Sequence, residues 1–166
     1  MLALTMLPAV AAGAPTIAEV SSGLSANSSP TGITAGPDGN LWFTQQASPS
    51  RIGRVTPAGV ISEFTAGLSP SLQPTGIAAG PDGNLWFTER ENPGLIGRIT
   101  PTGVITEFAA GLTANSLPTD IAAGPDGNLW FTEADGNRIG RMTPAGVLTE
   151  FSAGISPLSL PNGITA

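Results

Sequence analysis

The 166-residue sequence predicts an all-β fold made of repeated, four-stranded antiparallel units. The first observation is a repeat of about 44 residues, because Gly-Pro-Asp-Gly-Asn-Leu-Trp-Phe-Thr begins at Gly36, Gly80 and Gly124. The second is the abundance of glycine (22) and proline (16), which favours frequent turns over long helices. The third is that no window of about 11 residues shows a helical spacing of apolar side chains.

Each unit contains four short β-prone segments joined by turns. In the second unit the predicted strands are 76–79, 85–88, 95–99 and 104–108. In the first turn, Pro81 fixes the φ angle of the first position, Asp82 suits the second position, and Gly83 accepts the left-handed backbone conformation. Leu-Trp-Phe in the second strand and Val-Ile in the fourth place apolar side chains on both faces. We therefore expect each sheet to be covered by neighbouring sheets on both sides.

A period of about 44 residues with four strands is typical of a β-propeller blade. The units are residues 30–73, 74–117 and 118–160, and residues 161–166 begin a truncated fourth repeat. Residues 17–24 match 105–112, so 15–29 are predicted to supply an N-terminal closing strand and its connection to the first blade. The prediction is an incomplete ring of about three to four blades.

Composition excludes several functions. The net charge of −6 and the lack of lysine argue against binding nucleic acid, which requires a basic surface. Cysteine and histidine are absent, which removes thiol nucleophiles, histidine bases and their metal sites. Residues 1–14 are apolar and end in small residues, so we expect a signal peptide and a secreted or periplasmic protein. The apolar run is broken by Pro8 and is too short to span a membrane.

The motifs Gly-Pro-Asp-Gly-Asn-Leu-Trp-Phe-Thr-Glu, Ile-Gly-Arg-Ile-Thr-Pro-x-Gly and Thr-Glu-Phe resemble the virginiamycin B lyase (streptogramin lyase) family of β-propellers. The resemblance covers residues 17–166. It implies a seven-bladed ring and an elimination reaction that linearises cyclic depsipeptide antibiotics. It also implies Mg²⁺ held by glutamates, and a histidine base shortly after a Trp-Phe-Thr-Glu segment.

The glutamates of that pattern are present, but the histidine is not. Glu89 and Glu133 end the Trp-Phe-Thr-Glu segments, where the first unit has Gln45. Glu107 and Glu150 stand in the Thr-Glu-Phe segments. Two residues past the first glutamate position lie Ala47, Glu91 and Asp135, so no catalytic residue is assigned.

Residues that break the repeat, or that lie in the variable loops, are the candidates for a site. Glu133 with Asp135, together with Glu150, is predicted to hold Mg²⁺, since carboxylate oxygens suit hard cations. The residues predicted to bind a small molecule or peptide are Glu89, Arg90, Glu91, Asp120 and Asn137. The alternative is that these side chains only cover solvated loops.

Residues found in every unit are given structural roles. The tryptophans are expected to pack between blades, and the aspartates of Gly-Pro-Asp-Gly are expected to shape turns. The recurring arginine and glutamate are expected to form an ion pair between the third and fourth strands. These residues are Trp42, Trp86, Trp130, Asp38, Asp82, Asp126, Arg54, Arg98, Arg141, Glu63, Glu107 and Glu150.

Two functions remain open from the sequence. One is a secreted binding or scaffold module without lyase activity of its own. The other is the N-terminal half of a metal-dependent carbon–oxygen lyase. Three unclosed blades would expose apolar faces, so we also expect the chain to associate with itself.

Overall fold

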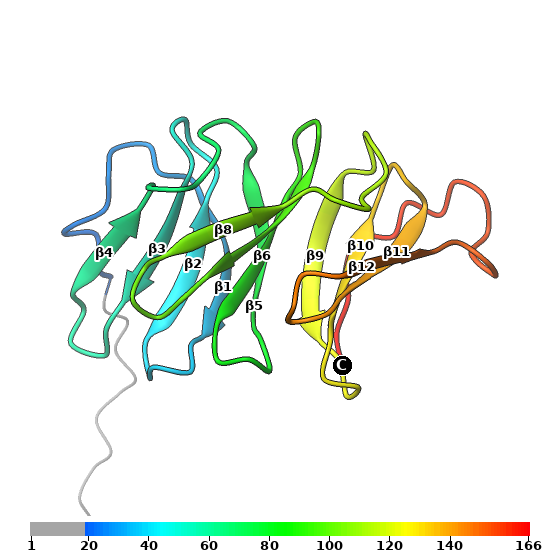
Figure 1. Ribbon diagram of the computed structural model, residues 1–166. Helices are drawn as coiled ribbons and strands as arrows, with labels where there is room; N and C mark the ends of the chain where they lie inside the picture. The colour runs from blue at the N-terminus through cyan, green and yellow to red at the C-terminus, as the bar shows by residue number, and fades with distance from the viewer. Residues whose placement is uncertain (1–18) are drawn as a thin grey trace, which may run out of the picture.

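The computed structural model describes residues 19–166, which form three four-stranded antiparallel sheets and contain no helix (Figure 1). The predicted signal peptide, 1–14, lies outside the described residues. Each sheet follows the chain order, as expected for a blade. Blade 1 is β1 (Pro30–Ala35), β2 (Leu41–Gln45), β3 (Arg51–Val55) and β4 (Ile61–Phe64); blade 2 is β5 (Pro74–Ala79), β6 (Leu85–Glu89), β7 (Leu95–Ile99) and β8 (Ile105–Phe108); blade 3 is β9 (Pro118–Ala123), β10 (Leu129–Glu133), β11 (Arg138–Met142) and β12 (Leu148–Phe151).

The predicted strands of the second unit are confirmed to within two residues at their ends. The turn between β5 and β6 also forms as predicted, because Gly83 has a φ of 75° and Gly80 donates its backbone N–H to the Asn84 carbonyl at 2.7 Å. The Asp82 carboxylate accepts the indole N–H of Trp86 at 3.1 Å. Burial raises the pKa of Asp82, but hydrogen bonds from Asn84 and Trp86 outweigh it and leave the pKa lowered. The turn aspartate therefore orients the tryptophan as well as shaping the turn.

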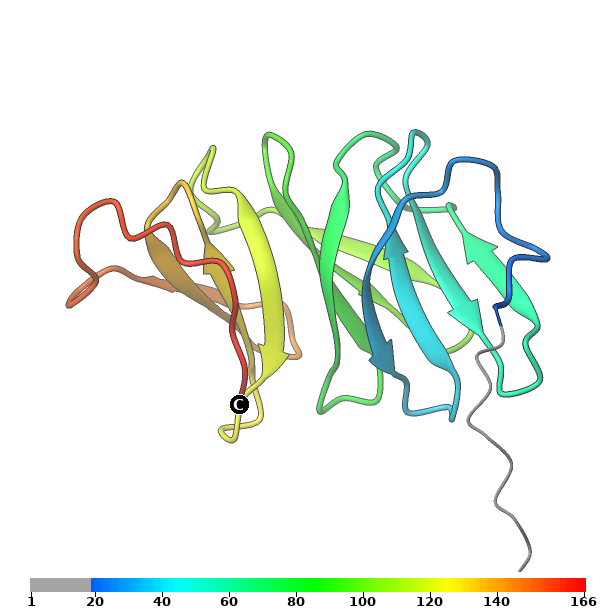
Figure 2. The same ribbon diagram turned by 180° about the vertical axis from the view of Figure 1, so that it is seen from behind.

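The first strands form the inner wall of the array (Figure 2). β1 lies beside β5, and β5 lies beside β9. Threonine hydroxyls tie one blade to the next: Thr44 donates to the Thr75 carbonyl at 2.7 Å and Thr88 to the Thr119 carbonyl at 3.0 Å. These bonds fix the inner edge of each blade against its neighbour.

The apolar core lies between the blades. Trp42 and Trp86 are fully buried, which confirms the predicted packing role, whereas Trp130 at the outer face of blade 3 is only partly buried. Each tryptophan stacks on the phenylalanine that ends the fourth strand of its own blade; Trp86 and Phe108 have ring centroids 5.4 Å apart. Burying such large side chains contributes about 1.5–3 kcal/mol each.

The predicted ion pair between the recurring arginine and glutamate is wrong. Arg54 stands opposite Trp42 and Ser62 in the sheet, and its guanidinium lies 5.5 Å from the centroids of the Trp42 and Phe64 rings. Glu63 stands opposite Gly53, on the other face of the sheet. The recurring arginine is thus a cation–π partner of the tryptophan.

The two ends of the described chain carry no strand. Residues 19–29 form turns beside β4, and the segment predicted to supply the closing strand and its connection, 15–29, lies partly outside the described residues. Residues 161–166 run alongside β9. The Asn162 carbonyl accepts the hydroxyl of Thr132 at 2.9 Å, in the same way that the Thr119 carbonyl accepts the hydroxyl of Thr88. Within residues 19–166 there is no helix with the length and apolarity needed to cross a membrane.

Candidate functional site

At one end of each blade, the side chains that close the second and fourth strands face each other. In blade 1 the Gln45 amide donates to Glu63 Oε1 at 3.0 Å. Ser25 also donates to Glu63, from its backbone N–H at 2.9 Å and from its hydroxyl. Arg51, at the start of β3, completes the site with an ion pair of 3.4 Å. Glu63 therefore keeps a lowered pKa: burial raises it, but the bonds from Ser25 and Gln45 lower it more.

In blade 2, Glu89 stands at the position of Gln45 and Leu95 stands at the position of Arg51. Glu89 is fully buried, and neither of its carboxylate oxygens has a hydrogen-bond donor among the described residues. Burial, followed by the nearby charge of Glu107, raises the pKa of Glu89 to about 9. Glu107 itself accepts the backbone N–H and the hydroxyl of Ser69 at 2.5 and 2.7 Å. Glu89 is therefore neutral at pH 7 and carries a proton that it can donate.

Blade 3 has the glutamate pair and the arginine together. Glu133 is also fully buried without a donor to its oxygens among the described residues, and Arg138 pairs with Glu150 at 3.6 Å. Burial and the charge of Glu150 raise the pKa of Glu133, but the Ser116 hydroxyl and, more weakly, the charge of Arg138 lower it, so the value reaches only about 7. Glu133 therefore loses its proton at a lower pH than Glu89 does.

Of the residues predicted to hold Mg²⁺, the structure brings Glu133 and Glu150 together, while Asp135 lies exposed in the following loop. Within residues 19–166 no group of three or more acidic, cysteine or histidine side chains is arranged to hold a metal ion. Mg²⁺ is often bound through one or two carboxylates, with water or substrate oxygens completing its shell. The orphaned oxygens of Glu133, beside Glu150, fit that smaller donor set.

The other residues predicted to bind a ligand, Arg90, Glu91 and Asn137, lie in the loops of two different blades. Arg90 and Glu91 follow β6 and are bound by their backbone to Gln73 and Leu72. The Asn137 side chain bonds Ser156 and Ser159, so it holds the connection after blade 3. These contacts give Asn137 a structural role.

Asp120 lies apart from the carboxyl pairs, on the inner strand β9. It replaces the glycine of the other two blades and borders a polar hollow of about 380 Å³, lined by residues of successive inner strands: Thr31, Gly32, Thr75, Gly76, Thr119, Asn162 and Gly163. Its carboxylate accepts the backbone N–H of Ile121 at 2.9 Å and of Ile164 at 3.0 Å. The sequence argument therefore identified one residue of a real hollow but not the threonines and glycines around it.

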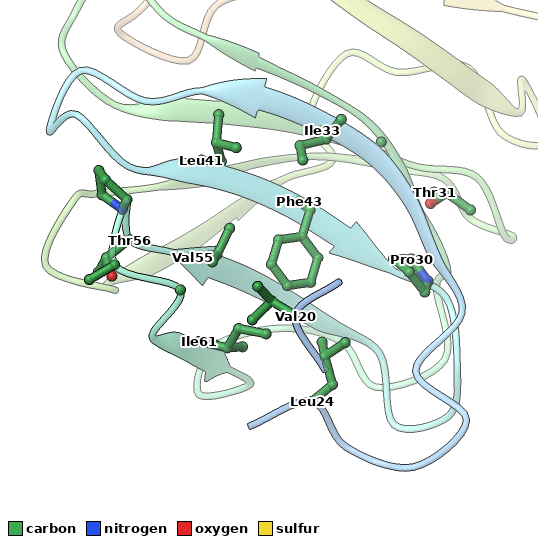
Figure 3. A pocket seen from close by; sticks show the side chains of 14 residues that line it. Val20, Leu24, Pro30, Thr31, Ile33, Leu41, Phe43, Val55, Thr56 and Ile61 are labelled. Atoms are coloured by element: carbon green, nitrogen blue, oxygen red, sulfur yellow. The ribbon is translucent and has the colours of Figure 1, made fainter. Parts of the chain in front are cut away.

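A second hollow, of about 670 Å³, was not predicted as a site. It lies on the outer face of blade 1 and is mainly apolar (Figure 3). Ile33, Leu41, Phe43, Val55 and Ile61 line it from the sheet, and Val20 and Leu24 approach from the N-terminal segment. The sequence repeat could have predicted this hollow, because the residues at the matching repeat positions of blades 2 and 3 are buried between blades.

Three consecutive four-stranded blades around a polar inner wall define a β-propeller array. A profile of the virginiamycin B lyase family matches residues 12–166, and the chain belongs to that family. No relative was found among curated proteins.

Solved structures of lyases resemble the chain over about half of their own length. Selenomethionine-substituted virginiamycin B lyase from Staphylococcus aureus is 42% identical with a TM-score of 0.77, covering 85% of this chain and 46% of that one. A catalytically inactive histidine-to-alanine variant from the same organism, with quinupristin, is 44% identical with a TM-score of 0.77, covering 83% and 45%. A streptogramin B lyase is 41% identical with a TM-score of 0.76, covering 82% and 44%.

Proposed function

We propose that this chain is a binding and scaffold module of the virginiamycin B lyase type, without lyase activity of its own. One observation carries the proposal: the chain contains no histidine, while a histidine-to-alanine change makes the related lyase inactive. The buried Glu89 and Glu133 do not replace such a base well, because burial favours their protonated form.

The ligand class we propose is a cyclic peptide of the quinupristin kind, since a related lyase was solved with quinupristin. The polar hollow beside Asp120 is the part of the inner wall we assign to it. Threonine hydroxyls, glycine backbone and one carboxylate offer hydrogen-bond partners to the amides of such a ligand.

The experiment combines calorimetry and chromatography. The purified chain is titrated with quinupristin in the presence of Mg²⁺, and the compound is then analysed for linear product. We expect heat of binding and recovery of the cyclic compound. Asp120→Ala should weaken binding, whereas Asp126→Ala, in an exposed turn, should not. Linear product would contradict the absence of catalysis, and absence of heat would contradict the binding role.

A second candidate is that these blades are the N-terminal half of a carbon–oxygen lyase, favoured by the 42% identity to a lyase. Reading the coding DNA past Ala166 tests it. A continuation with a histidine two residues after Trp-Phe-x-Glu, and turnover of quinupristin by the longer product, would support the enzyme. A longer product without turnover would contradict it.

The Mg²⁺ ion implied by the family would be held in this chain by Glu133 and Glu150. It would neutralise the two adjacent carboxylates. Calorimetry with Mg²⁺ alone tests this, with Glu133→Gln as the variant that removes one ligand and Asp135→Asn as the control in the exposed loop. Equal heats from both variants would contradict the assignment.

We also propose that residues 1–14 are removed on export. The proposal is supported by the apolar sequence and its small residues before Pro15. The intact mass of the protein recovered outside the cytoplasm should correspond to a chain that begins near Pro15, and a chain that retains Met1 would contradict it.

A further inference from the structure

The connection from blade 1 into blade 2, residues 65–73, covers the junction of these two blades, and we call it the strap. Leu68, near the middle of the strap, is only 8% exposed. It belongs to the buried cluster that contains Trp42 of blade 1 and Leu85 of blade 2. The strap can therefore open only by uncovering part of the core between the two blades.

A carboxylate anchors the middle of the strap. Glu107 on β8 accepts the backbone N–H of Ser69 at 2.5 Å and the Ser69 hydroxyl at 2.7 Å. Glu63 holds Ser25 of the preceding connection with the same two bonds in blade 1. Hydrogen bonds to a charged acceptor are roughly twice as strong as those between neutral groups. The closed strap thus depends on the Glu107 carboxylate remaining turned toward Ser69.

A second carboxyl group lies behind this anchor, where blade 1 has a neutral amide. The Gln45 amide donates to Glu63 at 3.0 Å, and Glu89 occupies the position of Gln45 in the sheet of blade 2. Glu89 is fully buried, and neither of its carboxyl oxygens has a donor among the described residues. Two carboxyl groups that share one buried site do not both ionise readily, so Glu89 and Glu107 retain one proton between them.

No cation among the described residues offsets a second charge at this pair. In the sheet, Glu89 has neutral partners on both sides, Pro74 on β5 and Leu95 on β7. Blades 1 and 3 have an arginine in place of Leu95, and each arginine pairs with the glutamate of its own fourth strand. Burial of Glu89 and the charge of Glu107, the charged group that faces it, raise the pKa of Glu89 to about 9.

The loop after β6 begins with two further charged residues, Arg90 and Glu91. Their backbone N–H groups donate to the strap, from Arg90 to the Gln73 carbonyl at 3.3 Å and from Glu91 to the Leu72 carbonyl at 3.2 Å. Within residues 19–166, neither side chain makes an ion pair with the buried carboxyl pair. This loop therefore supports the end of the strap without neutralising the pair.

We propose that the strap is a pH-sensitive closure over the core between blades 1 and 2. It stays closed while Glu89 and Glu107 keep their shared proton, and it opens at Ser69 when that proton is released to water. With both groups charged, one carboxylate must turn toward water, because a buried charge without a partner is costly. Turning Glu107 outward breaks both of its bonds to Ser69, and the opened strap uncovers Leu68 and the adjacent Trp42.

The direction of the pH effect follows from proton linkage. The closed strap holds a proton on Glu89 that the open strap releases between pH 4.5 and about 9. Over this range the equilibrium constant for opening should rise by up to about tenfold per pH unit, and above it the constant should level off.

Amide hydrogen exchange, followed residue by residue by NMR between about pH 6 and pH 8.5, tests the proposal. After correction for the intrinsic exchange rate, the protection factor of the Ser69 amide should fall by up to about tenfold per pH unit. Ser25 is the matched control in the same spectra. Its anchor Glu63 lies beside Gln45, which does not ionise, so its protection factor should stay constant.

Two variants and a reference strand complete the test. Glu89→Gln should make the protection factor of Ser69 independent of pH, whereas Glu133→Gln, the same change in blade 3, should leave its slope unaltered. The amides of β6 should remain more protected than Ser69, because the strap opens without unfolding blade 2. A protection factor of Ser69 that does not change with pH, or the same slope in Glu89→Gln, would overturn the proposal. Equal protection of Ser69 and the β6 amides would overturn it as well, since the strap would then open only when the blade unfolds.

Discussion

Gln45 and Glu63 form an amide–carboxylate hydrogen bond of 3.0 Å between the ends of β2 and β4. Blades 2 and 3 place a glutamate at the position of Gln45, so two carboxyl groups lie near each other there. A protonated carboxyl can donate as the amide does, but only while it keeps its proton. The blades therefore differ in how their stability depends on pH.

Glu89→Gln should remove a pH dependence of folding. Because the pKa of Glu89 is about 9 in the folded protein and 4.5 ordinarily, the folded state keeps a proton that the unfolded chain releases between these values. The free energy of unfolding of the unaltered protein should therefore fall as pH rises through this window. The variant keeps a donor at every pH and should be more stable than the unaltered protein at about pH 9, measured by urea denaturation.

The matched variant is Glu133→Gln in blade 3. Since the pKa of Glu133 is about 7, its stabilising effect should appear over a narrower pH window and reach its limit near neutrality. Equal pH profiles for the two variants would contradict the lower pKa of Glu133, which is attributed to Ser116 and, more weakly, to Arg138.

Gly97→Ala should destabilise the protein by about 1–3 kcal/mol, as overpacking of a filled core does. The Phe87 ring lies so close to Gly97 that an added Cβ would clash with its Cε2 and Cζ atoms. Gly163→Ala is the control, since no atom lies within 4 Å of a Cβ there. Urea denaturation compares the two, and equal midpoints would show that the ring can move away.

Trp86→Ala should cost about 3–5 kcal/mol of unfolding free energy, because the side chain is fully buried between two blades. Trp130→Ala should cost clearly less, since Trp130 has a blade on one side only and remains partly exposed. The comparison is made at low protein concentration, so that contacts between chains do not contribute. Equal losses would mean that the open face of blade 3 is covered in solution.

Arg98→Lys should lower stability by about 0.5–2 kcal/mol although the charge is kept, because the planar guanidinium lies 5.6 Å from the centroids of both the Trp86 and Phe108 rings. Arg138→Lys is the control, since Arg138 makes a partly exposed ion pair with Glu150 that should contribute about 1 kcal/mol at most. Thermal or urea denaturation measures both.

The repeat was enough to predict the strands, the turns and the packing role of Trp42 and Trp86. The expected ion pair of the recurring arginine does not form, because side chains alternate between the two faces of a sheet along each strand. Arg54 shares a face with Trp42, while Glu63 shares the opposite face with Arg51. Because this alternation can be read from the sequence, it is enough to place Arg54 and Glu63 on opposite faces of the sheet and to exclude an ion pair between them.

The candidate site was less accessible to sequence reasoning. Asp120 stood out because it replaces a glycine, but the hollow around it is formed by ordinary repeat residues such as Thr75 and Gly76. The raised pKa of Glu89 depends on burial and on the nearby charge of Glu107, and burial at a strand end is decided by the neighbouring segments.

The threonine bonds between the inner strands make the array a one-dimensional system with nearest-neighbour coupling. Blade 2 is held on both sides, through Thr44 to Thr75 and through Thr88 to Thr119, whereas each outer blade is held by a complete blade on one side. In such a system, local opening begins at the ends and the middle unit opens last. The backbone amides of β6 and β7 should therefore be the slowest to exchange with deuterated water, and protection should decline toward both ends of the chain.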